Sequence, residues 1–144
     1  MEYFENALRL EDYRKLRESV GWLNFNEEQT ARALCRSLYT ILVVSEGQTV
    51  GMGRLIGDGV YDTIVDVVVA PDYQKAGIGT QIMNRLLAYI EENTPAGGRT
   101  SVQLIAEKGK EGFYKTLGFQ EIPNAHCGSG MRKIFRKGYV TTNS

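Results

Sequence analysis

The sequence has little of what secreted, metal-binding and membrane-spanning proteins are built from. Its 144 residues include two cysteines, one histidine and three prolines. Two cysteines do not make a disulfide framework, and Cys127 beside His126 lacks the ligand spacing of a zinc site. No apolar run approaches the roughly 20 residues that a membrane span requires. We therefore expect no metal and no membrane partner.

Neither positive nor negative charge is in excess. The 17 Lys and Arg residues balance 17 Asp and Glu residues, so there is no broad electrostatic case for a nucleic-acid partner. The segment from Met1 to Asn6 carries acids where a secretory signal would carry bases. We expect a cytoplasmic protein. The length suits a single domain that spans residues 1–144.

What the sequence does have is an apolar strand followed by a glycine turn and a helix. Val65 to Ala70 is a short apolar run interrupted only by Asp66, as expected of a strand buried on both faces. Pro71 ends this strand because it has no N–H group to donate. A helical stripe then follows, with its apolar members at Ile78, Ile82, Met83, Leu86, Leu87 and Ile90.

The start of this helix is a candidate anion site. The first N–H groups of a helix have no intrahelical partner, and they carry the positive end of the helix dipole. Gly77 and Gly79 lack a Cβ that would keep a phosphate from the backbone. Lys75 adds a mobile positive charge. The alternative is that the two glycines only make a tight turn between strand and helix.

The remaining pattern predicts further helices and strands. Tyr3 to Leu8 is a candidate opening strand, and Glu11 to about Val20 a short helix. Asn26 has the character of an N-cap, and the helix that follows should bury Ala31, Leu34, Cys35 and Leu38. A three-stranded antiparallel meander is expected at Thr40–Val44, Thr49–Leu55 and Thr63–Val69.

The C-terminal part continues with alternating elements. Ser101–Ala106 should be a strand parallel to the one before the long helix, reached by a right-handed crossover. Phe113–Leu117 is a short helix, and Gly118 is placed as the residue after its C-cap. Two last strands are expected at Phe119–Ile122 and Met131–Phe135.

Two motifs resemble those of the GCN5-related N-acetyltransferase (GNAT) superfamily. Residues 69–79, Val-Ala-Pro-Asp-Tyr-Gln-Lys-Ala-Gly-Ile-Gly, are similar to its Gln/Arg-x-x-Gly-x-Gly/Ala phosphate turn. Residues 112–119, Gly-Phe-Tyr-Lys-Thr-Leu-Gly-Phe, are similar to its tyrosine-bearing helix. The resemblance implies an α/β (α+β) fold: a mixed, mostly antiparallel central sheet of six to seven strands with helices on both faces. A splayed parallel strand pair at the cofactor cleft is part of that fold.

The same resemblance implies acetyl-CoA as the acetyl donor, with no metal. The pyrophosphate would bind backbone N–H groups of the turn, and the pantetheine amides would pair with the strand before it. Lys110 is a candidate contact for the nucleotide phosphates, or else part of a solvated charge run. The implied cofactor-binding residues are Val67, Val68, Val69, Gln74, Lys75, Ala76, Gly77, Ile78, Gly79, Thr80, Lys110 and Tyr114.

Two residues are predicted to be catalytic, Tyr114 and Asp66. Tyr114 would protonate the departing thiolate, because an unperturbed phenol with a pKa of about 10 keeps its proton at neutral pH. The alternative is that it packs beside Phe113. Asp66 would take the amine's proton through water or orient the ammonium group, unless it is paired with Arg54 or another base. Glu107 is a second candidate base; it replaces an asparagine that the family often has there.

The expected function is therefore transfer of acetyl from acetyl-CoA to a primary amine of a small molecule or peptide, in a ternary complex. The alternative is a non-catalytic module that binds acetyl-CoA. A homodimer is possible by resemblance. Acceptor specificity is expected from Trp22–Phe25, Gly57–Tyr61 and Pro123–Gly130, because loops on a rigid scaffold commonly carry it. Asp58 and Asp62 are candidates to attract a cationic amine.

Overall fold

The computed structural model describes residues 1–138. The chain divides into two compact units, the first spanning Met1–Ile105 and the second beginning at Ala106. A single domain over the whole chain stays a prediction. No helix within residues 1–138 is long and apolar enough to cross a membrane.

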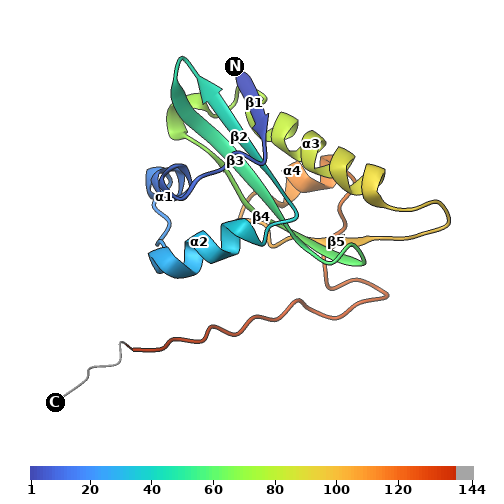
Figure 1. The fold of residues 1–144 in the computed structure, drawn as a ribbon. Coiled ribbons are helices and arrows are strands. Elements are labelled where there is room, and N and C mark those ends of the chain that lie inside the picture. The colour runs from blue at the N-terminus through green and yellow to red at the C-terminus, as the bar shows by residue number, and fades with distance from the viewer. Residues whose placement is uncertain (139–144) are drawn as a thin grey trace. The chain divides into compact units, whose positions relative to one another are not determined.

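A five-stranded sheet forms the centre of the first unit (Figure 1). Its strands follow in the order β1-β2-β3-β4-β5, and the first four are antiparallel, whereas β5 runs parallel to β4. The predicted meander and the parallel crossover are therefore confirmed. The strands are β1 (Glu2–Glu5), β2 (Tyr39–Ser45), β3 (Gln48–Gly57), β4 (Tyr61–Val69) and β5 (Ser101–Gln103).

Helices cover both faces of this sheet (Figure 1). On one face lie α1 (Leu10–Ser19) and α2 (Glu27–Cys35), and on the other lies α3 (Ile78–Asn93). The Asn26 side-chain oxygen accepts a hydrogen bond of 2.9 Å from the Gln29 backbone N–H, which confirms Asn26 as the N-cap of α2.

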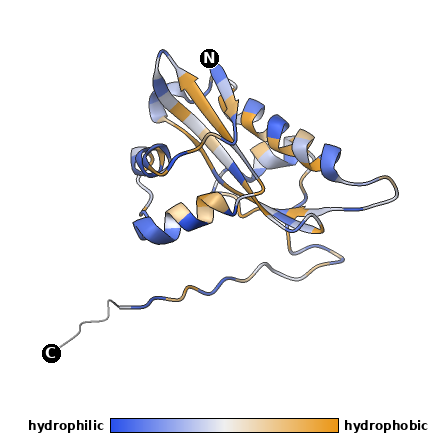
Figure 2. Ribbon diagram, viewed as in Figure 1, coloured by the Kyte–Doolittle hydropathy of each residue, from blue (hydrophilic) through white to orange (hydrophobic). Residues whose placement is uncertain are grey.

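The face under α3 is packed tightly with apolar groups. Ile82, Met83 and Leu86 are fully buried, and polar and apolar residues alternate along α3 (Figure 2). Gly53 of β3 permits the close approach, because a Cβ there would lie 2.5 Å from the Ile82 Cγ2 atom. At Gly51 a Cβ would lie 3.3 Å from Ile78 and Ile82, so the helix is held nearest to Gly53.

The face under α1 has its own core, made of Leu8, Tyr13, Leu16, Leu42, Met52 and Val68. The prediction for α2 was wrong at Ala31 and Cys35, which are exposed. The buried residue of α2 is Thr30, whose hydroxyl donates a 2.8 Å hydrogen bond to the Asn26 carbonyl. One residue is about 100° around a helix, so a stripe placed one position too late turns its members toward solvent.

The second unit contains the short helix α4 (Glu111–Thr116). Gly118 follows the C-cap with φ +93°, as predicted. The Phe119 N–H donates to the Tyr114 carbonyl at 3.2 Å, and the Gly118 N–H donates to the Lys115 carbonyl at 3.0 Å. These two bonds are the pattern of a Schellman motif.

The predicted number of strands is not confirmed. The sheet has five strands within residues 1–138, and β5 ends at Gln103 rather than Ala106. The segments Phe119–Ile122 and Met131–Phe135 are not strands, and the side chain of Met131 is 96% exposed. An apolar alternation favours extended backbone, but a strand also requires a ladder partner. These segments have none within the described part of the chain.

Candidate functional site

The long strand β4 has one edge that is largely free. Its parallel pairing with β5 joins Tyr61 to Ser101 and ends at Thr63 and Gln103. From Ile64 to Val69, no strand among the described residues pairs with β4 on that side. The expected separation of the two parallel strands is thus present, and it leaves backbone N–H and C=O groups available to an added extended ligand.

A β-bulge lies in the middle of this free stretch. Arg54 pairs with Val65 and Met52 with Val68, so Asp66 and Val67 together stand opposite Gly53. Asp66 has φ +55°, a left-handed conformation that aspartate tolerates better than most residues. A bulge removes backbone groups from the ladder. It therefore frees N–H groups in the strand that was predicted to pair with the pantetheine amides.

The turn after β4 fits an anion. Lys75 and Gly77 have φ +67° and +79°, and Gly77 is the N-cap of α3, with no side-chain cap and no acid in the first turn. A Cβ at Gly77 would meet nothing within 4 Å, so the backbone is open to a ligand. The N–H groups and dipole of a 16-residue helix are thus available for a pyrophosphate.

The structure brings most of the predicted cofactor residues together. Val67, Val68 and Val69 lead through a single-turn 3-10 helix, Pro71–Tyr73, into the turn and α3. The Gln74 amide donates a 3.0 Å hydrogen bond to the Val69 carbonyl, which ties the turn to the strand. The side chains of Lys75, Ala76 and Thr80 are exposed and Gly79 is half-buried. Ile78 buries its side chain, and this leaves the predicted role of its backbone N–H unchanged.

Asp66 is the centre of a cluster of polar groups. Its carboxylate accepts hydrogen bonds from the Tyr13 hydroxyl at 2.9 Å, from Arg17 at 2.7 Å and from Arg54 Nε at 3.1 Å. The three charged side chains are only 8–11% exposed. The pairing with Arg54 that the sequence left open is therefore present. The role of Asp66 as a base stays a prediction.

Several groups contact the Arg17 guanidinium. The sequence pattern did not single out Arg17, nor did it predict that Tyr13 would bond to Asp66. The guanidinium carbon of Arg17 lies 5.2 Å from the Trp22 ring centroid and 4.9 Å from that of Phe25. One terminal nitrogen donates to the Leu23 carbonyl at 2.7 Å, whereas the buried Nε has no partner within residues 1–138. The available signal was a charged residue on the buried stripe of a helix, four positions after Tyr13.

The environment of Tyr13 changes its acidity. Burial first, and then the negative charge of Asp66 and the hydrogen bond to it, raise the pKa of Tyr13 to about 12. The phenol therefore stays a hydrogen-bond donor to Asp66 throughout the neutral range.

Asp58 and Asp62, which were expected to attract the acceptor amine, instead accept hydrogen bonds from the backbone of a turn. Asp58 accepts hydrogen bonds of 2.9 Å from the backbone N–H groups of Val60 and Tyr61, and these bonds, that of Tyr61 first, lower its pKa. Asp62 accepts a 2.9 Å bond from the Gly59 N–H. Both carboxylates stabilise the β3–β4 connection.

In the second unit, Tyr114 is half-buried between two rings. The ring centroids of Phe113 and Phe119 lie 5.0 and 6.2 Å from its own, both edge-on. Burial, and to a lesser extent the charge of Glu107, raise the pKa of Tyr114. The predicted packing beside Phe113 and a protonated phenol thus occur together. Lys110 directly precedes α4 and is exposed.

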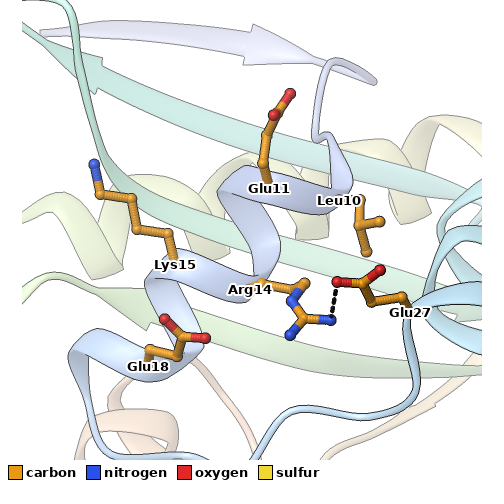
Figure 3. Close-up of a pocket in the computed structure, with 6 residues that line it drawn as sticks. All are labelled: Leu10, Glu11, Arg14, Lys15, Glu18 and Glu27. Carbon is orange, nitrogen blue, oxygen red and sulfur yellow. Dashed lines mark ion pairs between the residues drawn. The ribbon is translucent and has the colours of Figure 1, made fainter.

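Two hollows lie on the α1–α2 side of the first unit. The larger, about 540 Å³, lies over the outer side of α1 and has a charged lining in which Arg14 pairs with Glu27 at 3.0 Å (Figure 3). The smaller, about 170 Å³, includes Tyr13 and Arg54 in its lining. Both of these residues contact Asp66. The smaller cavity is therefore the one that adjoins the bulge.

Comparison with known proteins gives the family. The model of the acetyltransferase (GNAT) domain matches residues 10–134. A chloroplastic serotonin N-acetyltransferase 2 from Oryza sativa subsp. japonica is 38% identical over 111 residues, which cover 74% of this chain; the chain spans only 54% of that relative's length.

Solved structures agree with the fold. A GNAT-family acetyltransferase from Streptococcus pneumoniae is 33% identical, with a TM-score of 0.78 over 94% of this chain and 98% of that one. A probable acetyltransferase of unknown function from meticillin-resistant Staphylococcus aureus is 28% identical, with a TM-score of 0.80 over 92% and 98%. With the free strand edge, the bulge and the open glycine turn, these matches show that the chain belongs to the GNAT acetyltransferase family.

Proposed function

We propose that this protein transfers the acetyl group of acetyl-CoA to a primary amine of a small molecule or peptide, by direct attack in a ternary complex. The observation that carries the proposal is the free edge of β4, which is followed, after a short turn, by the N-terminus of α3, where no side chain caps the helix. An extended ligand that ends in an anion matches that arrangement, because the edge offers a ladder and the helix offers N–H groups.

The donor would be held by the first unit. Val67, Val68 and Val69 would pair through their backbone with the pantetheine amides. Backbone N–H groups from Lys75 to Thr80 would bind the pyrophosphate, with Lys75 adding charge. Acetyl-CoA supplies the acetyl group as a thioester when it is bound.

Acyl transfer also needs a hydrogen-bond donor that stabilises the developing oxyanion, and a general acid that protonates the departing thiolate. We assign the first role to an N–H group of the β4 bulge, because the bulge takes such groups out of the ladder. We assign the second to Tyr114. Its raised pKa keeps the phenol protonated over the whole neutral range.

Asp66 remains the predicted acceptor of the amine's proton. Its carboxylate is shared by Arg17 and Arg54, so a proton on it would weaken two ion pairs. We therefore also assign it a positioning role, in which the ion pairs hold the bulge residue at its positive φ. Water or Glu107 is the other candidate for the proton.

The acceptor class is supported by the name of the rice relative, a serotonin N-acetyltransferase, since serotonin is a primary amine. A cytoplasmic location and a homodimer are further proposals. Sedimentation of the purified chain tests the second.

Acetyl-CoA binding and release of free thiol with a panel of primary amines test the function. Gly77→Glu should weaken acetyl-CoA binding at least tenfold, because it places a carboxylate at the anion site. Gly97→Glu is the matched control: Gly97 also has φ +79° and nothing within 4 Å of its Cβ position. Equal affinity in the two variants would remove the turn from the donor site.

Tyr114→Phe tests the acid. We expect thiol release to fall about 100-fold at constant acetyl-CoA affinity, within the usual range for loss of a general acid. Tyr89→Phe, on α3, is the control. Saturable acetyl-CoA binding without turnover of any amine, and no effect of Tyr114→Phe, would instead support the non-catalytic module.

A further inference from the structure

In the polar cluster around Asp66, positively charged groups outnumber negatively charged ones. Two guanidinium groups, Arg17 and Arg54, share the single carboxylate of Asp66. Within residues 1–138, no other acid forms an ion pair with either arginine. A nearly buried cation without a counterion is unfavourable, so the cluster has one positive charge that an anion would stabilise.

The two arginines differ in how much of their bonding capacity is used. Arg17 bonds to Asp66 and the Leu23 carbonyl, and it lies over three aromatic rings. Arg54 places Nε and one terminal nitrogen 3.1 Å from the Asp66 carboxylate and donates from the other terminal nitrogen to Ser37 at 3.2 Å. A guanidinium has five N–H donors, so each terminal nitrogen of Arg54 keeps one for a ligand.

Arg54 lines the smaller cavity, which has a volume of about 170 Å³. The rings of Tyr13 and Phe25 line it too, with Thr30, Ala33 and Leu34 from α2. No acidic residue is among its lining residues. An apolar cavity of about 150 Å³ is large enough for benzene, so this one suits a ring or short chain of similar size.

The cavity adjoins the proposed acyl-transfer centre. Tyr13 and Arg54 line the cavity and also bond directly to Asp66, the bulge residue on the free edge of β4. A group held in the cavity would thus lie one side chain from the bulge. Phe25 in the lining of the cavity belongs to the Trp22–Phe25 loop, from which acceptor specificity was expected.

We propose that this cavity is the specificity subsite for the acceptor and that it binds an apolar group ending in a carboxylate. The carboxylate neutralises the excess positive charge of the cluster by bonding to Arg54. The rings of Tyr13 and Phe25, together with Leu34, enclose the apolar part. A second ammonium group is excluded, because the one charged lining residue is an arginine. The role as an acceptor subsite rests on the proposed transfer to amines, whereas anion binding can be measured without it.

Equilibrium binding tests the site in the full chain without acetyl-CoA. Benzoate and benzamide have nearly the same shape and differ in charge. By calorimetry we expect benzoate to bind at least tenfold more tightly than benzamide, and to change the fluorescence of Trp22, the single tryptophan. Equal affinities for the two probes, or no binding of benzoate, would overturn the proposal.

Two variants locate the binding. Arg54→Gln should abolish the preference for benzoate, with folding checked by circular dichroism. Ala33→Leu fills the cavity from α2 without touching the cluster and should weaken benzoate binding more than tenfold. Ala31→Leu is the matched control, because Ala31 lies on the same helix and is exposed. Benzoate binding that survives Ala33→Leu would overturn the proposal even if Arg54→Gln does not fold.

Acetylation of two matched amines links the site to the acceptor. 4-(Aminomethyl)benzoate should have a KM at least tenfold below that of 4-methylbenzylamine, and Ala33→Leu should remove the difference. Equal KM values would show that the cavity is not an acceptor subsite. Benzoate binding in a protein that releases no thiol with any amine would overturn the proposed function while leaving the anion site in place.

Discussion

The two faces of the sheet bury different kinds of side chain. Against α3, Ile82 and Leu86 are fully buried and pack over Gly51 and Gly53. Against α1, the apolar core is interrupted by Asp66, which is paired with Arg17 and Arg54. A face made of apolar contacts contributes stability roughly in proportion to its buried area, whereas buried ion pairs are a weak source of net stability and costly to break.

This difference suggests a division of roles. The α3 face fixes the helix that begins after the turn at Gly77. The α1 face holds the bulge and the smaller cavity, which Arg54 lines. We expect substitutions on the first face to change stability alone. Substitutions on the second face should change stability together with ligand binding.

Asp66→Asn should have the largest effect. Asparagine tolerates the positive φ of this residue, so the change removes mainly the charge between Arg17 and Arg54. Loss of one partner in a buried pair costs about 3–5 kcal/mol of unfolding free energy, measured by urea denaturation. Asp72→Asn, an exposed aspartate that follows β4, should cost less than about 0.5 kcal/mol. A loss below about 1 kcal/mol for Asp66→Asn would contradict the charged-cluster interpretation.

Leu86→Ala tests the apolar face. Leu86 is fully buried against the sheet, and truncation of such a residue costs about 2–5 kcal/mol. Benzoate affinity should stay within twofold of wild type in the folded variant, because Leu86 lies on the face away from the cavity. A parallel loss of stability and benzoate affinity would show that the two faces are coupled.

Gly53→Ala and Gly51→Ala compare two degrees of contact on the same face. A Cβ at Gly53 would lie 2.5 Å from Ile82, and one at Gly51 would lie 3.3 Å from its nearest neighbours. We expect a cost of about 1–3 kcal/mol for Gly53→Ala, as for overpacking, and less for Gly51→Ala. Ile82→Ala should recover part of the Gly53→Ala loss in the double variant; additive losses would contradict the proposed contact.

Tyr13→Phe should have the smallest effect at neutral pH, about 1 kcal/mol for one hydrogen bond. The pKa of Tyr13 is raised from 10.0 to about 12, so the native state keeps a proton that the unfolded chain has lost. Wild-type stability therefore falls as pH rises from 10 to 12. The Tyr13→Phe variant lacks this contribution, so it should lose less stability than the wild type over the same pH range.

Urea unfolding at several alkaline pH values measures the difference between wild type and Tyr13→Phe. Tyr61→Phe is the control, because Tyr61 is 72% exposed. The stability of this variant should change with pH as that of the wild type does. An unchanged gap between Tyr13→Phe and wild type from pH 8 to 12 would contradict the raised pKa.

Several elements could be predicted because their signals are local. Three such features are present: the helical period from Ile78 to Ile90, the Asn26 N-cap, and Gly118 after the C-cap of α4. Each depends on a few neighbouring residues. The strands expected near the C-terminus were not found, because the same apolar alternation needs a partner strand to form a ladder.

The site divides in the same way. The glycine turn follows from composition and order, since only an unobstructed helix N-terminus is required. The pairing of Asp66 joins residues 49 and 12 positions apart, and Arg17 was not foreseen as its partner. A charged residue inside an apolar run indicated that some partner must exist, but not which one.

The sequence by itself determined the strand–turn–helix unit around Gly77, because backbone conformation and helix polarity depend on neighbouring residues. It also determined the family to which the chain belongs. The tertiary structure alone decided that β4 carries a bulge at Asp66 and parts from β5 after Thr63. It also decided that one carboxylate is shared by two arginines beside a cavity, because such arrangements depend on register and packing between distant segments.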